Sequence, residues 1–277
     1  MSWVSVARKD FIDSRRSKGL WALIGLYVAL LALTVYVAPS DVSMTNVLRL
    51  LALVGIFIIP ISALIIAYLA IAGERESGSI KFLLGLPNTR LDLVIGKFVG
   101  RSAVVAVGLA LAFVIAAVEG SILLASVDIA ILAQFFLLFL FFAVTYIAIA
   151  VGLSAACASR SRAMASSVGV FFVFNVLWTV PAISPSRALR FIADDTLGVH
   201  LSAQIYEFVY LVSPPYAFQR AADLVFTDQQ LYYFRVIGQN ATVPFFLEKW
   251  FMLVILAAWL VVPLVLGYWR FERADLG

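Results

Sequence analysis

Residues 129–153 read IAILAQFFLLFLFFAVTYIAIAVGL and contain no charged side chain. A helix needs about 20 apolar residues to cross the roughly 30 Å hydrocarbon core of a bilayer, so this run is long enough to span one. The chain of 277 residues is 64% hydrophobic and 13% charged, with a mean hydropathy of +1.04. A single soluble core of this size cannot bury so many apolar residues. The composition therefore excludes a soluble enzyme, a disordered tail and a secreted disulfide scaffold.

Five more apolar runs of similar length flank this one. Backbone polar groups in lipid must be paired within their own segment, so all six runs are predicted to be helices. We expect an all-α membrane protein with six transmembrane helices, forming a single transmembrane domain over residues 1–277. The predicted spans are residues 20–38, 50–72, 102–126, 129–153, 163–183 and 250–269.

Positive charges are distributed unevenly between the segments that join these spans. Cytoplasmic segments carry an excess of Lys and Arg close to the membrane. Most of the 20 Lys and Arg residues lie on one side, and most of the others lie in one long loop, where the rule has little weight. We expect a multi-pass protein of the cell membrane with both termini in the cytoplasm. The residues on the predicted cytoplasmic side are Arg8, Lys9, Arg15, Arg16, Lys18, Arg75, Lys81, Arg90, Lys97, Arg101, Arg160, Arg162, Arg270 and Arg273.

None of the predicted spans has a charged residue near its middle. Glu119 comes nearest, and it lies about 27 Å along a helix from Arg101, close to the outer surface. Carriers driven by protons or ions normally keep ionisable side chains at membrane depth, so this chain would need energy from outside itself. Gly96-Lys97-Phe98 lacks the hydroxyl residue and the upstream glycine of a phosphate-binding loop. If ATP drives the protein, another polypeptide binds it.

Residues 1–18 have the pattern of a basic amphipathic helix. Val4, Ala7 and Phe11 follow i, i+3, i+7 spacing, whereas Lys9 and Asp13 lie on another face. Such a helix can lie in the headgroup region before the chain turns into the membrane at the first span. The alternative is ordinary anchoring by positive charges.

The predicted cytoplasmic loop 73–101 is not a plain connector. It begins with charged residues, continues with Ile80, Leu83 and Leu84 at helical spacing, and reaches a helix-stopping Pro87. A second short stretch begins near Thr89 and runs into the third span. The pattern predicts a small helix whose apolar face docks in a groove of a partner protein. A solvated loop is the alternative, but it would expose a cluster of large apolar side chains.

The pattern ERExGSIxxLLxLPxxR at 74–90, followed by IGK at 95–97, resembles the signature of permease subunits of the type-2 ATP-binding-cassette exporter family. The ARKDF stretch at 7–11, the six spans and the long loop before the last span are similar to that family too, so the resemblance covers essentially the whole chain. The size and the GExExG form at 73–78 also resemble the branch linked to maturation of multicopper enzymes such as nitrous oxide reductase.

The resemblance implies an assembly of two permease copies and two cytoplasmic ATP-binding subunits, with loop 73–101 as the coupling helix. A second, shorter contact would lie between spans four and five, although its arginines are equally expected only to set the topology. The implied ATPase-coupling residues are Glu74, Glu76, Lys81, Phe82, Arg90, Arg160 and Arg162, and the implied elbow-helix residues are Arg8, Lys9 and Phe11.

The predicted outer loop 184–250 is too long for a plain connection. Residues 201–212 have helical apolar spacing that ends at Ser213-Pro214-Pro215, and a second amphipathic stretch covers 217–226. We expect these helices to be interfacial or, as the resemblance implies, re-entrant. The surplus length would contact an extracytoplasmic partner or substrate, with disorder of 228–243 as an equal expectation.

Catalytic and metal-binding chemistry finds little support in the sequence. Cys157 is the single cysteine and His200 the single histidine, which leaves no His/Cys metal cluster. His200 with Asp194 and Asp195 lacks a nucleophile at a recognisable turn. We expect no catalytic, cofactor-binding or metal-binding residues and no nucleic-acid partner.

The leading hypothesis is the transmembrane subunit of an ATP-driven exporter. A membrane scaffold or assembly factor that recruits a complex without transport is the first alternative, and a membrane-embedded enzyme is the second. The substrate and the choice between a homodimer and a heterodimer stay open.

Overall fold

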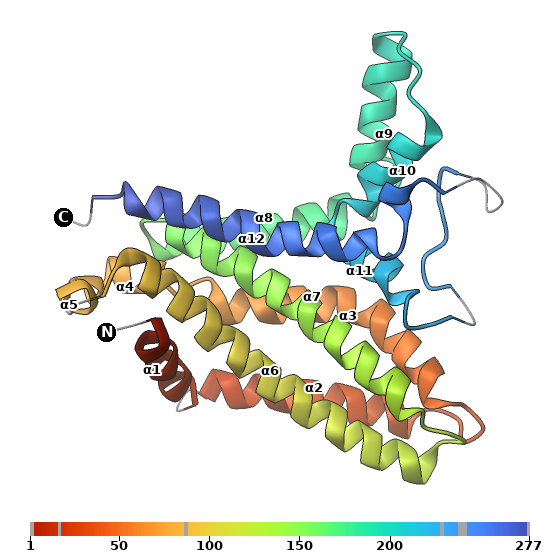
Figure 1. Cartoon of the computed structure of the whole chain (residues 1–277), viewed down its shortest axis with the longest axis horizontal. Helices are drawn as coiled ribbons and strands as arrows, with labels where there is room; N and C mark the ends of the chain where they lie inside the picture. The colour runs from red at the N-terminus through yellow and green to blue at the C-terminus, as the bar shows by residue number, and fades with distance from the viewer. Residues whose placement is uncertain (1–2, 16–17, 86–87, 228–229, 238–242, 276–277) are drawn as a thin grey trace.

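The computed structural model describes residues 3–15, 18–85, 88–227, 230–237 and 243–275. Its long helices run side by side along the length of the molecule (Figure 1). Both termini and the short helices α4 (Ala72–Glu76) and α5 (Ile80–Gly85) lie at one end of this bundle, here called the termini end. The segments between residues 184 and 250 lie at the opposite end, here called the loop end (Figure 1).

Four helical stretches are long and apolar enough to cross a membrane, among the residues that the structure describes. This confirms the predicted class of an all-helical membrane protein. They are Met44–Glu76, Arg90–Leu123, Ile129–Ala156 and Phe251–Glu272. Within them, α3 covers Met44–Ala67, α6 Arg90–Leu123, α7 Ile129–Ala156 and α12 Phe251–Glu272.

Two of the six predicted spans correspond to helical stretches outside these four. The first is α2 (Lys18–Tyr36), whose apolar part is Trp21–Tyr36. The second begins as α8 (Arg160–Phe171) and continues as a π-helix, η1 (Phe172–Leu177). The number of spans therefore stays a prediction.

One predicted boundary differs from the structure for a local reason. The second span was expected to reach residue 72, but α3 ends at Ala67 and the amides of Ile71 and Ala72 donate to the Ser154 hydroxyl of α7, each at 3.0 Å. The stretch near Thr89 runs into the third span as predicted, in a helix that begins with a reciprocal capping box of Thr89 and Asp92.

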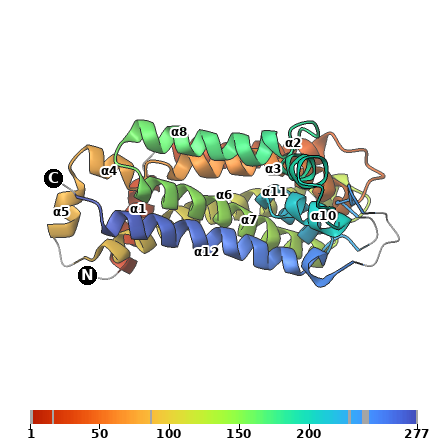
Figure 2. The same ribbon diagram turned by 90° about the horizontal axis from the view of Figure 1, so that it is seen from above.

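The core of the bundle lies around α7, between α3 and α12 in the view from above (Figure 2). Phe135, Phe139 and Phe142 line one side of α7 and are almost completely buried. Helix α11 (Pro214–Ala222) inserts Phe218 against them, and its ring stacks on Phe142 with centroids 4.4 Å apart. Offset aromatic contacts of this kind add to the ordinary van der Waals packing of membrane helices.

The loop end contains three more short helices and a π-helix. They are α9 (Pro185–Arg190), η2 (Phe191–Thr196), α10 (Ala203–Leu211) and η3 (Phe245–Leu247). The α9–η2 segment projects away from the bundle (Figure 1). The predicted helix over 201–212 is confirmed as α10, and Pro214 and Pro215 begin the next helix. That helix, α11, was expected to be interfacial or re-entrant, and it is buried along its whole length.

Within residues 228–243, for which disorder is an alternative expectation, some of the described residues are hydrogen-bonded to buried carboxylates. Residues 228–229 and 238–242 lie outside the described residues. Between them, the Leu231 amide donates to Asp223, and the Val236 amide donates to Glu207 at 2.6 Å. Both carboxylates are fully buried. Burial raises the pKa of the Asp223 carboxyl, and the hydrogen bonds from Leu231 and Arg220 oppose that shift.

Helices α7 and α12 approach each other through glycine. A Cβ atom at Gly152 would lie 2.2 Å from the carbonyl oxygen of Pro263, and one at Gly267 would lie 2.3 Å from the carbonyl oxygen of Gly152. Small residues permit close backbone contact between membrane helices, where packing rather than the hydrophobic effect drives association.

We therefore expect Gly267→Ala to destabilise the protein by about 1–3 kcal/mol, the usual cost of overpacking. The matched control is Gly25→Ala on α2, where an added Cβ meets nothing within 4 Å. The control should leave the stability unchanged or raise it, because Ala is the better helix former. Thermal unfolding of the detergent-solubilised protein, followed by circular dichroism, compares the two; equal melting temperatures would contradict the packing described.

Candidate functional site

The segment between α3 and α6 forms a compact structure at the termini end. Helices α4 and α5 are joined by a tight turn in which Gly78 has a φ of +73°, a conformation that favours glycine. The hydroxyls of Ser77 and Ser79 donate to the carbonyl oxygen of Glu74, at 3.3 and 3.4 Å. These bonds satisfy a carbonyl at the end of α4, so the segment is a structured element rather than a solvated loop.

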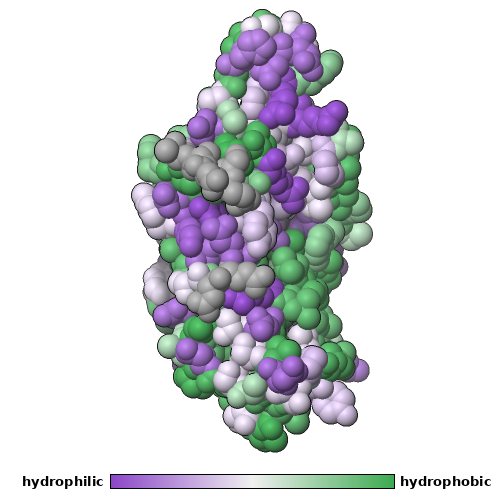
Figure 3. Space-filling model, turned by 90° about the vertical axis from the view of Figure 1, so that its right-hand side faces the viewer, coloured by the Kyte–Doolittle hydropathy of each residue, from purple (hydrophilic) through white to green (hydrophobic). Residues whose placement is uncertain are grey.

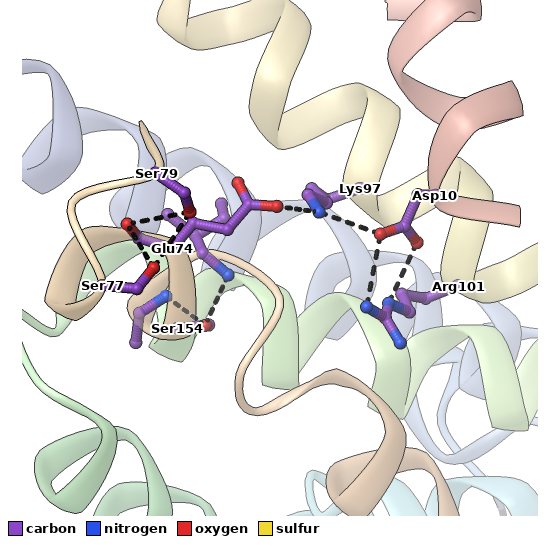
Figure 4. A network of polar contacts seen from close by, with 9 residues as sticks. Asp10, Glu74, Ser77, Ser79, Lys97, Arg101 and Ser154 are labelled. Atoms are coloured by element: carbon purple, nitrogen blue, oxygen red, sulfur yellow. Dashed lines mark hydrogen bonds and ion pairs between the residues drawn. The ribbon is translucent and has the colours of Figure 1, made fainter. Parts of the chain in front are cut away.

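A network of four charged side chains joins this segment to α1 (Trp3–Arg15) and α6 (Figure 4). The Lys97 ammonium of α6 donates to Asp10 of α1 at 2.9 Å and also to Glu74 of α4. Arg101, one turn further along α6, pairs with the other oxygen of Asp10 at 3.0 Å. Two positive and two negative charges thus balance in a region where the Asp10 side chain is only 3% exposed.

Two glycines allow α1 to lie close enough to α6 for this network. A Cβ at Gly96 would lie 2.5 Å from Cβ of Val6, and one at Gly100 would lie 2.9 Å from Asp10 Oδ2. The Trp3 amide also donates to Asp92 in the first turn of α6, at 3.0 Å. The contact face of α1 therefore includes a carboxylate beside its apolar residues.

This contact covers part of the predicted amphipathic face of residues 1–18, and the position of that face in the headgroup region stays a prediction. Ala7 is buried, whereas Val4 and Ile12 are exposed, by 51% and 39%. The side of α1 that meets α6 is set by the glycines of α6 and by the charge on Asp10 rather than by an apolar stripe alone. Of the implied elbow residues, Arg8 and Lys9 are exposed, and Phe11 packs beside Ile24 and Val104.

Two arginines attach the segment to the ends of α7 and α12. Arg75 donates to the carbonyl oxygen of Cys157 at 2.9 Å, and Arg90 donates to those of Glu272 and Ala274 at 2.8 and 2.9 Å. Both guanidinium groups lie over the ring of Phe271, 5.8 and 5.4 Å from its centroid. The carbonyls at a helix C-terminus attract cations, so these contacts are favourable electrostatically as well.

The other implied coupling residues fall into two groups. Glu76 meets Arg160 at the start of α8, accepting its backbone amide at 2.6 Å and lying 3.9 Å from its side chain. Lys81 and Phe82 on α5 are exposed, Phe82 by 83%, and Arg162 is exposed on α8. Glu74 and Arg90 hold the segment from within, whereas Lys81 and Phe82 face outward.

Asp10, Lys97 and Arg101 were not among the predicted site residues. Asp10 is 87 residues from Lys97 and 91 residues from Arg101 in the chain, so no local spacing indicates these pairs. The sequence did contain one signal of a close helix contact here: Gly96 and Gly100 are at i and i+4 in a predicted helix, beside Lys97.

His200 lies apart from this region. Its side chain is 84% exposed, and its ring nitrogen is 3.7 Å from Asp194. No group of three or more His, Cys, Asp and Glu side chains that could hold a metal ion occurs within the described part of the chain.

We expect Lys97→Met to loosen α1, because it leaves the Glu74 carboxylate without its cation and the buried Asp10 with Arg101 alone. The free energy of unfolding should fall by less than about 3 kcal/mol, the lower end of the cost of leaving a fully buried charge unpaired, because Asp10 keeps Arg101 and Glu74 is 23% exposed. Hydrogen exchange of the amides in residues 3–15 measures this directly. Lys9→Met, the same substitution on the exposed side of α1, is the control and should leave the exchange unchanged; equal protection in both variants would show that the network does not hold α1.

The comparisons with known proteins agree with the resemblance seen in the sequence. The family described as ABC-2 family transporter protein matches residues 4–276. The chain is 31% identical over 221 residues to the probable ABC transporter permease protein NosY of Pseudomonas aeruginosa, covering 76% of this chain and 77% of that protein. It is 26% identical over 280 residues to the probable ABC transporter permease protein NosY of Stutzerimonas stutzeri, covering 97% of each. The chain therefore belongs to the ABC-2 transporter family, as a multi-pass transmembrane subunit of an ABC transporter that is not itself catalytic.

Proposed function

We propose that the chain is the permease of an ATP-driven exporter in which two permease copies bind two cytoplasmic ATP-binding subunits. Six spans are proposed, with α2 and α8–η1 crossing beside the four long helices. An even number of spans agrees with the position of both termini at one end of the bundle (Figure 1). The termini end carries most of the positively charged residues, which supports placing that end on the cytoplasmic side of the cell membrane.

The observation that carries the proposal is the exposure of Phe82 on the short helix α5. The segments on either side of α5 are held in place by Glu74 and Arg90. An aromatic side chain that is 83% exposed is costly in water and is typical of an anchor residue at an interface. Helix α5 lies at the extreme of the termini end, away from the predicted bilayer (Figure 1). We assign Lys81 and Phe82 to direct contact with the ATP-binding subunit, and Arg162 and the Glu76–Arg160 pair to a second contact beside them.

Glu74 and Arg90 are assigned a transmitting role in this proposal. A displacement of α5 reaches α1 and α6 through the Glu74–Lys97–Asp10 contacts. It reaches α12 through Arg90, which holds the last carbonyls of that helix. Closure of the ATP-binding dimer would then tilt the helices of the bundle as rigid units, because packed helices usually slide or rotate as whole elements.

The proposal includes export as the direction of transport and membership of the branch linked to multicopper-enzyme maturation. The resemblance to the branch linked to multicopper-enzyme maturation, with two relatives named NosY, supports placing the chain in that branch. An extracytoplasmic partner would bind at the loop end, where the α9–η2 segment projects from the bundle (Figure 1).

The test is Phe82→Asp in the full chain, co-expressed with its ATP-binding subunit. Burying a Phe side chain on docking is worth about 2 kcal/mol, so its loss should reduce co-purification more than about tenfold. Tyr233→Asp, which replaces a 56% exposed aromatic residue at the loop end, is the control. Both variants should insert normally.

Wild-type yield of the ATP-binding subunit with Phe82→Asp would contradict the assigned contact. ATP-binding subunits that bind normally but show no hydrolysis linked to the permease would instead support a scaffold that recruits a complex without transport.

A further inference from the structure

A polar pocket of about 390 Å³ lies at the loop end, between α9 and residues 235–236. Three arginines line it: Arg187 and Arg190 from α9, and Arg235 from the segment after α11. Viewed from that end, hydrophilic residues gather below the projecting part of the molecule (Figure 3). In the proposed orientation this pocket faces the outside.

Arg235 is held in place by neutral groups. Its guanidinium lies over the rings of Tyr210 and Tyr216, 5.3 and 4.7 Å from their centroids, and donates to the Tyr216 hydroxyl at 3.0 Å. Its backbone amide donates to the buried carboxylate of Glu207 at 2.9 Å, as does the next amide. Glu207 therefore positions the backbone and leaves the charge of the Arg235 side chain available.

The pocket arginines lack the carboxylate partner that Arg220, also at the loop end, has. Arg220 pairs with the Asp223 carboxylate at 3.2 Å. Among the described residues, none of the ion pairs within 4.0 Å involves Arg187, Arg190 or Arg235.

Negative charge near the pocket does not offset these arginines. Arg190 lies over the ring of Tyr206, 4.8 Å from its centroid, and the Tyr206 hydroxyl donates to Asp194. The lining contains three arginines and one acidic residue, Asp195, so it carries an excess of positive charge.

We propose that this pocket binds a phosphate group. Guanidinium groups match the oxygens of phosphate with paired hydrogen bonds, and several arginines without counter-ions leave that charge to an external ligand. The volume is large enough for a phosphate and a small polar substituent. Pro181, at the outer end of the α8–η1 helix, and Phe191 also line the pocket, which places it near the headgroup level of the outer leaflet.

The same chemistry is offered by an anionic phospholipid headgroup and by a soluble phosphate ester, and the experiment separates them. The full chain is reconstituted in nanodiscs of phosphatidylcholine, with or without phosphatidylglycerol. Native mass spectrometry measures retained phosphatidylglycerol, and calorimetry in phosphatidylcholine alone measures binding of glycerol 3-phosphate. Retained lipid identifies a headgroup site, and binding of the free ester identifies a soluble ligand; either result supports the pocket when it depends on the arginines.

Arg187→Gln with Arg235→Gln should weaken binding at least about tenfold, because each charged hydrogen bond contributes substantially to affinity. Lys18→Gln with Arg270→Gln removes the same charge from exposed positions at the other end and should change nothing. Asp195→Asn should tighten binding by removing a like charge from the ligand's surroundings. Arg187→Gln alone, on the exposed face of α9, tests the site if the double variant fails to fold.

Binding of neither probe, or binding that is equal in the wild type and in the Arg187→Gln variants, would overturn the proposal. The experiment contains no nucleotide and no ATP-binding subunit. Its outcome is therefore independent of the proposed coupling function.

Discussion

The Lys97 ammonium lies between two carboxylates that belong to different parts of the chain, Asp10 of α1 and Glu74 of α4. Taking these charges out of water is costly, and the cost is recovered only while all of them stay together. Arg101 completes the balance on Asp10. Moving α1 or α4 away from α6 would break an ion pair that is largely shielded from water. These ion pairs keep α1, α4 and α6 together.

The remaining contacts of the termini end build on that constraint. The glycines of α6 let α1 approach, and the Ser154 hydroxyl receives two amides at the start of α4. Arg90 reaches the last turn of α12, 182 residues away in the sequence. The apolar bundle behind is held mainly by close packing, as at the crossing of α7 and α12. The two regions thus depend on different physical effects: charge pairing at the termini end and shape complementarity within the predicted bilayer.

Local patterns predicted much of this architecture. The apolar runs, the start of α6 at Thr89 and the helix boundary at Ser213 follow from composition, capping chemistry and proline. The pairing of Asp10 with Lys97 could not be predicted, because one sequence holds no information on contacts between distant charges. The burial of α11 was one of two open alternatives, since an amphipathic pattern does not distinguish a lipid surface from the interior of a bundle. Phe82 was selected by resemblance, and its exposed fraction of 83% is known only from the structure.

The most direct test of the account is whether α1 and α5 move as one body when ATP binds to the assembled transporter. Spin labels at Lys9→Cys and Lys81→Cys, in a Cys157→Ser background, report the distance between these exposed sites by pulsed electron paramagnetic resonance. A second pair, at Lys81→Cys and Tyr233→Cys, reports movement across the bundle. The account predicts that ATP changes the second distance and leaves the first unchanged. A comparable change in both distances would contradict it.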